Sequence, residues 1–208
     1  MYKKKSLFIV FEGIEGSGKS YLSKNLYNNL RKRGIPVLIT REPGGTKRAE
    51  KIRKIILNDY FLKKNNEKFH KYTDTLLYLA ARNEHIENKI KPALTKRKIV
   101  ICDRFVDSTL AYQVYGKGVN KNFVDQIHRQ ILGKIKPNLT FLLKVKIEKA
   151  LKRLKKRKKK NRYDKFSKNF YIKAQKAFIK IANKNKNSYV IYDSSLDNKD
   201  LEKKIFNL

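Results

Sequence analysis

The chain has 208 residues, which suits one well-filled α/β domain and is short for two independent ones. Its 52 Lys and Arg residues against 18 Asp and Glu residues give a formal net charge of +34, spread over nearly every predicted helix. The single cysteine excludes an internal disulfide, and no segment approaches the roughly 20 apolar residues of a membrane span. Because the N-terminus also lacks a secretion signal, we expect a cytoplasmic protein with no membrane partner.

The start of the chain predicts a strand, a glycine-rich loop and a helix. Residues 7–11 read as a buried strand, residues 13–20 complete the pattern G-x-x-x-x-G-K-[ST], and leucines on one helical face follow. Such a loop directs backbone N–H groups at phosphate oxygens beside a helix N-terminus. It predicts binding of a nucleoside triphosphate, with Lys19 on the outer phosphates and Ser20 on Mg²⁺. The loop residues assigned to the donor nucleotide are Gly13, Ile14, Glu15, Gly16, Ser17, Gly18, Lys19 and Ser20.

Strands and helices alternate along the rest of the chain. Further strands are predicted at residues 37–40, 99–102, 139–145 and 189–192. The first helix should stop at Gly34, a short helix carries Ala49 and Ile56, and residues 63–66 read as a loop. Later helices are expected at residues 72–90, with Pro92 just beyond, and at 122–132, 147–157, 169–183 and 197–206. The alternation predicts an α/β fold, a five-stranded parallel sheet with helices on both faces.

Polar side chains follow two of these strands. Arg41 and Glu42 come after the second strand, and Asp103 and Arg104 begin a polar stretch after the third. Ligands of such sheets bind at the carboxyl ends of the strands, so these residues predict a second site beside the phosphates. No N-K-x-D guanine signature follows the loop, which disfavours a GTPase.

Four segments in this order resemble the thymidylate kinase family. They are residues 11–20, 40–46, 79–82 and 103–113, and the resemblance extends from residue 7 to about residue 183. It implies a P-loop NTPase fold forming a single domain over residues 1–208, and a homodimer. It also implies phosphorylation of dTMP to dTDP by Mg-ATP through direct in-line transfer, a step of dTTP biosynthesis.

The resemblance also assigns the acceptor site. Glu15 matches the acid that faces the deoxyribose 3'-hydroxyl, Tyr78 the aromatic residue that stacks on thymine, and Arg82 the arginine that hydrogen-bonds the base. Tyr112 matches the aromatic residue that disfavours ribose, and Asp103 the aspartate that orients Mg²⁺. The substrate-binding residues implied are Glu15, Arg41, Pro43, Arg53, Tyr78, Arg82, Arg104, Thr109, Tyr112 and Gln113. The sequence leaves the isomer of the bond before Pro43 open.

A basic run at about residues 153–165 lies where the family has its lid. Some members carry an arginine in the phosphate loop, whereas this loop has Gly16 and Ser17 after Glu15, so the transition-state cations are expected from the lid. Asn161 departs from the aspartate usual in the family. The implied catalytic residues are Lys19, Asp103, Arg104, Arg153, Arg157 and Arg162, and the implied metal ligands are Ser20 and Asp103.

Two other functions are compatible with parts of the sequence. A deoxynucleoside kinase would need a general base for a 5'-hydroxyl, for which Glu42 or Asp103 could serve, but the many arginines favour an acceptor that already bears phosphate. A basic nucleic-acid-binding ATPase would explain the charge, yet no nucleic-acid recognition module is present. The three histidines have no spacing of a metal site or catalytic triad and are read as incidental.

Overall fold

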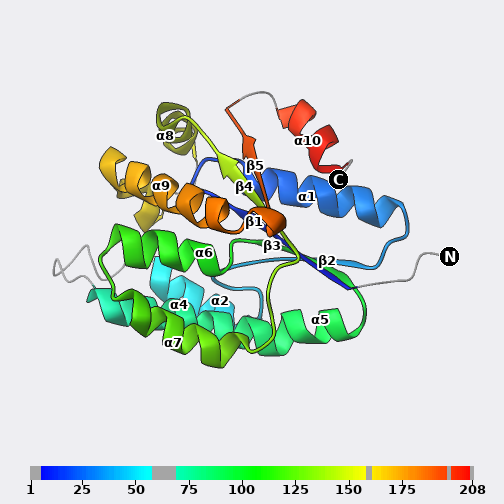
Figure 1. Cartoon of the computed structure of the whole chain (residues 1–208), viewed down its shortest axis with the longest axis horizontal. Helices are drawn as coiled ribbons and strands as arrows, with labels where there is room; N and C mark the ends of the chain where they lie inside the picture. Colours follow the sequence, from blue (N-terminus) through cyan, green and yellow to red (C-terminus); the bar gives the residue numbers. More distant parts are fainter. Residues whose placement is uncertain (1–5, 58–68, 158–160, 196–197, 207–208) are drawn as a thin grey trace.

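A parallel sheet of five strands lies between two layers of helices in the computed structural model, which describes residues 6–57, 69–157, 161–195 and 198–206 (Figure 1). This confirms the predicted α/β architecture. The strands are β1 (Leu7–Glu12), β2 (Val37–Arg41), β3 (Ile99–Asp103), β4 (Leu139–Lys144) and β5 (Tyr189–Asp193). The helices are α1 (Lys19–Lys32), α2 (Lys47–Leu57), α4 (Lys71–His85), α5 (Lys91–Thr95), α6 (Val106–Thr109), α7 (Lys121–Leu132), α8 (Ile147–Lys155), α9 (Lys168–Lys184) and α10 (Asn198–Phe206).

The side chains of β1 alternate between the two helical layers. Ile9 and Phe11 belong to a core that includes residues of α1 and α10. Phe8 and Val10 lie on the opposite face, in a core with Ile86 and other residues around α5. Because successive residues of a strand face opposite sides, a continuous apolar strand is what a sheet covered on both faces requires.

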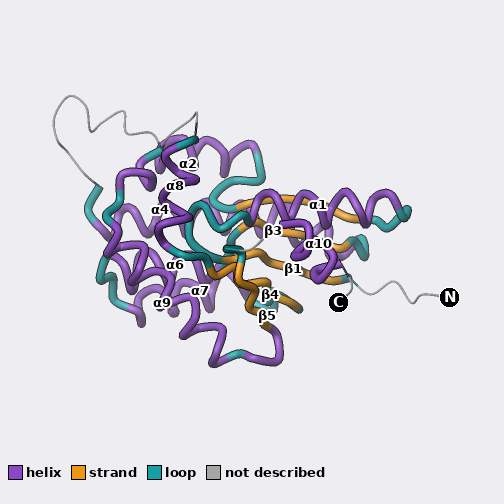
Figure 2. The backbone as a smooth tube through the Cα atoms, turned by 90° about the horizontal axis from the view of Figure 1, so that it is seen from above, coloured by secondary structure: helices purple, strands orange, loops and turns teal. Residues whose placement is uncertain are grey.

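The order of the strands places the site. They run β2-β3-β1-β4-β5, so the chain passes from β1 to one side of the sheet and, after β3, crosses to the other side (Figure 2). The carboxyl ends of β1 and β3 therefore flank the crevice where the order reverses, the usual ligand position in such sheets. Phe11 is in register with Asp103, so the phosphate loop and the polar stretch start side by side.

The predicted end of the long helix at about residue 90 is wrong. After α4 the chain forms a π-helical segment, Ile86–Ile90, and continues into α5, which has Pro92 in its first turn. A proline is tolerated there because its missing N–H belongs to the first turn of the new helical segment. In a π-helical turn each backbone N–H bonds to the carbonyl five residues earlier instead of four. This shift in hydrogen bonding allows the helical segment to continue beyond the proline.

A second helical segment was missed between residues 106 and 116. Here α6 leads directly into a π-helical segment, Leu110–Gly116. The start of α6 is fixed from outside, because the Glu12 carboxylate accepts hydrogen bonds from the backbone N–H groups of Phe105 and Ser108. A cap supplied by a distant strand leaves no local sequence signal.

The other predicted strands and helices begin and end within about two residues of the observed ones, the usual uncertainty of element ends. The loop predicted at residues 63–66 lies outside the described residues. Cys102 is buried in β3. Within the described segments, no helix combines the length and apolar content needed to cross a membrane.

Two glycines give a test of this fold. Gly13 has φ +136°, and a Cβ there would lie 2.6 Å from the Leu143 carbonyl oxygen, whereas Gly34 has φ +70° with nothing within 4 Å. We expect Gly34→Ala to cost about 1–2 kcal/mol of left-handed strain, and Gly13→Ala to cost about 1–3 kcal/mol more because backbone must move. Urea unfolding of both variants measures the difference, and equal losses would contradict it.

Candidate active site

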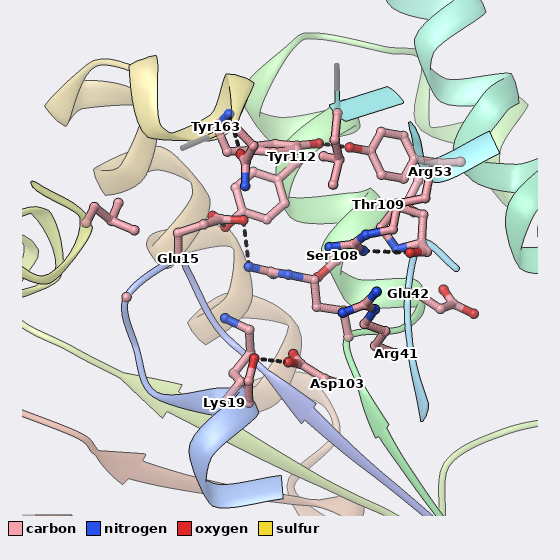
Figure 3. A pocket seen from close by; sticks show the side chains of 18 of the residues that line it. Glu15, Lys19, Arg41, Glu42, Arg53, Asp103, Ser108, Thr109, Tyr112 and Tyr163 are labelled. Carbon is pink, nitrogen blue, oxygen red and sulfur yellow. Dashed lines mark hydrogen bonds and ion pairs between the residues drawn. The ribbon is translucent and has the colours of Figure 1, made fainter. Parts of the chain in front are cut away.

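A cavity of about 390 Å³ lies beyond the carboxyl ends of the strands and is walled by the phosphate loop, α4, the segment after β3, and α8 (Figure 3). The predicted site residues that line it are Glu15, Gly16, Gly18, Lys19, Ser20, Arg41, Pro43, Arg53, Tyr78, Arg82, Asp103, Arg104, Thr109, Tyr112, Gln113, Arg153 and Arg157. Gly13, Ile14, Ser17 and Arg162 do not line it. Ser108 of the polar stretch after the third strand also lines the cavity, as does Tyr163, which no sequence pattern had indicated.

The phosphate loop holds Lys19 under the start of α1. Its ammonium group donates to the Ile14 carbonyl at 2.7 Å, and Ser17 Oγ lies 3.4 Å away. Burial, followed by repulsion from Arg104, lowers the pKa of Lys19 to about 8. An ammonium group already stripped of water binds an incoming phosphate strongly, because little further desolvation is needed.

Ser20 and Asp103 meet where α1 begins and β3 ends. The Ser20 hydroxyl donates to Asp103 Oδ2, while the other carboxylate oxygen, Oδ1, is buried with no hydrogen-bond partner. Hydroxyl and carboxylate oxygens are the ligands that Mg²⁺ prefers, and an unpaired buried carboxylate oxygen fits a bound cation. No group of three or more His, Cys, Asp or Glu side chains suited to a metal occurs among the described residues. The pair therefore fits an ion that takes its other ligands from phosphates and water.

Arg104 and Glu15 form an ion pair at the centre of the cavity. The Arg104 guanidinium donates to Glu15 at 2.7 Å and to the Gly13 carbonyl at 2.9 Å, and the Tyr112 hydroxyl donates to the other Glu15 oxygen. Burial raises the pKa of Glu15, but the Arg104 and Lys19 cations outweigh it, so the pKa lies below its ordinary value. The cavity thus presents a charged carboxylate directly beside a cation (Figure 3).

Glu12 supports this arrangement from behind. Besides capping α6, it accepts the Ser108 hydroxyl at 2.7 Å, and Ser108 Oγ accepts a hydrogen bond from Arg104 at 2.9 Å. Arg104 has φ +73°, a strained conformation for a residue with a side chain, so these contacts fix it in place. Burial and the neighbouring Asp107 raise the pKa of Glu12 to about 8. One sequence signal could have indicated that Glu12 has a role in the site, namely its position as an acidic residue at the end of an otherwise apolar strand.

The Arg82 guanidinium is buried, with 2% of its side chain exposed, and joins four elements. It donates from Nε to Glu42 at 2.7 Å, from Nη1 to Thr109 at 2.8 Å and to His128 Nε2 at 2.7 Å, and from Nη2 to the Phe105 carbonyl at 2.9 Å. A guanidinium carries five N–H groups, so in the described part of the chain one Nη2 hydrogen remains for a ligand.

The reading of all three histidines as incidental is wrong for two of them. His85 is fully buried, and its Nδ1 donates to Glu42 at 3.1 Å while Nε2 lies 2.7 Å from Thr40 Oγ1. His128 accepts from Arg82, as described above. Burial raises the pKa of Glu42, yet Arg82 and His85 lower it below its ordinary value. The position of His85 three residues after Arg82 on one helix was the signal available.

Tyrosines form the wall opposite the phosphate loop. The Tyr78 and Tyr163 hydroxyls are hydrogen-bonded to each other, and the Tyr112 and Tyr163 rings pack edge to face with centroids 5.4 Å apart. The Glu42–Pro43 bond is cis, and the Pro43 carbonyl accepts from Arg53 at 2.6 Å. A wall of aromatic rings with polar groups beside it fits a flat heterocycle, which can lie against one of the ring faces.

The three arginines of the basic run lie in different surroundings. Arg153 donates to the Gly16 carbonyl at 2.8 Å, which ties α8 to the phosphate loop, and Arg157 lines the cavity. Arg162 instead donates to Asp74. A Cβ on Gly16 would lie 2.7 Å from the Ala150 carbonyl oxygen, so α8 leaves no room for a side chain there. Residues 158–160 of the predicted lid lie outside the described residues.

The chain has close relatives among known proteins. The thymidylate kinase family model matches residues 11–205. A thymidylate kinase of Sulfurihydrogenibium sp. is 40% identical over 196 residues, covering 94% of this chain and 93% of the relative. One of Wolbachia pipientis wMel is 44% identical over 178 residues, covering 85% of each. The crystal structure of thymidylate kinase from Ehrlichia chaffeensis is similar with a TM-score of 0.75 at 32% identity, over 98% of this chain and 97% of that one.

His128 makes the stability of this site depend on pH. Burial, then the Arg82 and Lys121 charges, lowers its pKa from 6.5 to about 3, so between these values the unfolded chain binds a proton that the folded chain does not. This stability is complete above pH 6.5 and is lost as the pH falls toward about 3. We expect His128→Gln, which keeps an acceptor for Arg82, to flatten the pH dependence of the unfolding free energy in this window. His70→Gln at an exposed position is the control, and parallel curves for wild type and His128→Gln would refute the assignment.

Proposed function

The chain belongs to the thymidylate kinase family and is an ATP-dependent dTMP kinase, and we propose that it transfers the γ-phosphoryl group in line to the 5'-phosphate of dTMP, without a phosphoenzyme, in a step of dTTP biosynthesis. The observation that carries the proposal is one cavity with the phosphate loop at one end, the Arg104–Glu15 ion pair at its centre and Arg82 at the other end. Such a cavity can hold two nucleotides with their phosphates facing each other.

At the donor end, the backbone of residues 13–20 and the Lys19 ammonium group would bind the β- and γ-phosphates of ATP. Ser20 and Asp103 would hold Mg²⁺, because one Asp103 oxygen is buried and unpaired and the Ser20 hydroxyl lies on the other. When bound, the ion would neutralise charge on the donor phosphates. Arg153 and Arg157 line the cavity from the side of α8 and are the candidates to stabilise charge on the equatorial oxygens.

At the acceptor end, Arg104 would hold the 5'-phosphate, with Arg41 and Arg53 on the same wall of the cavity. Glu15 would accept the 3'-hydroxyl, since a carboxylate has about four lone-pair sites and the protein groups described here use two of them. Tyr112, already hydrogen-bonded to Glu15, lies where it would crowd a 2'-hydroxyl.

The base would lie against the tyrosine wall. Tyr78 supplies a ring, and the remaining N–H of Arg82 supplies a single donor for a base oxygen. Thr109 accepts a hydrogen bond from Arg82, and the Gln113 amide also lines the cavity. Because the one remaining Arg82 hydrogen can only be donated, the site favours a carbonyl over an amino group on the base.

The deoxynucleoside kinase alternative needs a general base for a 5'-hydroxyl. Glu42 is engaged by Arg82 and His85 and has a lowered pKa, which makes it a weak base. Asp103 accepts a hydrogen bond from the Ser20 hydroxyl, so one of its oxygens is already occupied and less able to act as a general base. Nothing among the described residues favours a nucleic-acid-binding ATPase. We further propose one domain over residues 1–208 that acts as a homodimer in the cytoplasm, as the resemblance to the family implies.

The acceptor test uses purified protein, Mg-ATP and one acceptor at a time. We expect dTMP to be strongly preferred over thymidine, with dUMP a weaker acceptor. We expect dCMP to be worse, since its 4-amino group presents a donor to the donor of Arg82. The measurement is kcat/KM for each acceptor by coupled ADP release. A preference for thymidine over dTMP would support the deoxynucleoside kinase instead.

The donor test removes the phosphate-loop charge. Lys19→Ala should lower kcat by about 10³ or more, because a cation on the transferring group is lost in a water-poor site. Lys24→Ala, at an exposed position of the same helix, should leave kcat within about twofold, since a single surface charge is screened by solvent. The measurement is kcat from steady-state kinetics, with circular dichroism to verify that each variant is folded. A folded Lys19→Ala variant with normal kcat would show that the phosphate loop takes no part in the reaction.

A further inference from the structure

Arg162 lies in a different environment from the other two arginines of the basic run. Its guanidinium donates to Asp74 and lies over two aromatic rings, 6.0 Å from the centroid of Tyr78 and 5.4 Å from that of Tyr163. It does not line the cavity, whereas Arg153 and Arg157 do. Its surroundings are therefore those of a side chain that holds parts of the protein together.

Asp74, its partner, is fully buried on α4 and gathers groups from two other segments. Lys117 donates to Asp74 Oδ2 at 2.7 Å, and Gln113 Nε2 lies 3.4 Å from the same oxygen. Arg162 takes the other oxygen, Oδ1. A buried carboxylate needs such partners, and the Arg162 guanidinium that compensates its charge is thereby engaged within the protein.

The position of this ion pair determines what it can control. Arg162 is adjacent to Tyr163, which lines the cavity and shares a hydrogen bond with Tyr78, a residue one helical turn after Asp74. The Tyr163 carbonyl also accepts the Tyr171 hydroxyl of α9. The segment that carries Tyr163 is thus attached to α4 on one side and to α9 on the other.

We propose that the Asp74–Arg162 ion pair fastens the segment carrying Tyr163 to α4 and so completes the base wall of the acceptor site. Arg162 is then a positioning residue and not a cation on the transferring phosphoryl group. This role rests on the proposed function, because it acts through the acceptor half of that same cavity. Loss of either partner weakens acceptor binding, while the phosphoryl-transfer machinery stays in place.

The first test separates binding from chemistry. We expect Arg162→Gln and Asp74→Asn each to raise the KM for dTMP on the order of tenfold, the scale of coupling between linked sites, with kcat within about threefold. The double variant should be no worse than either single variant, because both remove the same contact. Lys117→Gln, which removes the other cation from Asp74 and leaves Arg162 in place, is the matched control and should change KM by less than about threefold.

The second test needs no activity. Hydrogen–deuterium exchange of the peptide covering residues 161–171 should be faster in Arg162→Gln and in Asp74→Asn than in wild type and Lys117→Gln, in protein without nucleotides. If Asp74→Asn does not fold, Arg162→Gln alone carries both measurements. A wild type unable to phosphorylate dTMP would overturn the proposed function, and the exchange experiment would still test the ion pair.

Two results would overturn the inference. If Arg162→Gln lowers kcat by about 10³ with an unchanged KM for dTMP, while Asp74→Asn behaves as wild type, Arg162 is a transition-state cation. If exchange of residues 161–171 is the same in all four proteins, the ion pair does not fasten the segment.

Discussion

The site depends on one buried ion pair, Arg82 with Glu42. Their side chains are 2% and 3% exposed and their charged atoms lie 2.7 Å apart, so each charge is stabilised by its partner and not by water. The same guanidinium binds the Phe105 carbonyl, Thr109 and His128, and thereby joins the end of β2, the start of α6 and α7 to α4. Removing one partner of such a pair costs about 3–5 kcal/mol because the other charge is left buried. The contact that organises the deepest wall of the cavity therefore also stabilises the layer of helices behind it.

Acidic side chains have a particular use in this basic chain. The described Asp and Glu residues that are fully or almost fully buried lie around the cavity, behind or beside its cations; they are Glu12, Glu42, Asp74 and Asp107. Glu42 and Asp74 hold arginines, and Glu12 holds Arg104 through Ser108. A surface rich in Lys repels further cations, so close packing of arginines in one cleft requires negative charge, which Glu42 and Asp74 supply. Glu12, whose pKa is raised to about 8, contributes hydrogen bonds instead.

The sequence was sufficient where the signal is local. Apolar runs of five or six residues, a glycine loop and helical periodicity predicted the sheet, the layers and the phosphate loop, because each is specified by neighbouring residues. The sequence did not predict contacts between residues that are far apart in the chain. Glu12 caps α6 from 93 residues away, Arg162 reaches Asp74 across 88 residues, and the Tyr78 and Tyr163 hydroxyls meet across 85. No periodicity encodes such pairs, and the π-helical segments fail for the same reason, since their extra residue is accommodated by packing.

The close approach of α8 to the phosphate loop restricts how this enzyme could change. Gly16 has φ +76°, and a Cβ there would lie 2.7 Å from the Ala150 carbonyl oxygen, so the loop cannot gain a side chain at that position while α8 stays where it is. A loop arginine, as some family members have, would require Arg153 to release Gly16 and the whole helix to move outward. A loop with an arginine at position 16 is therefore separated from the present loop by a rearrangement of the backbone, and intermediates between the two would be poorly packed.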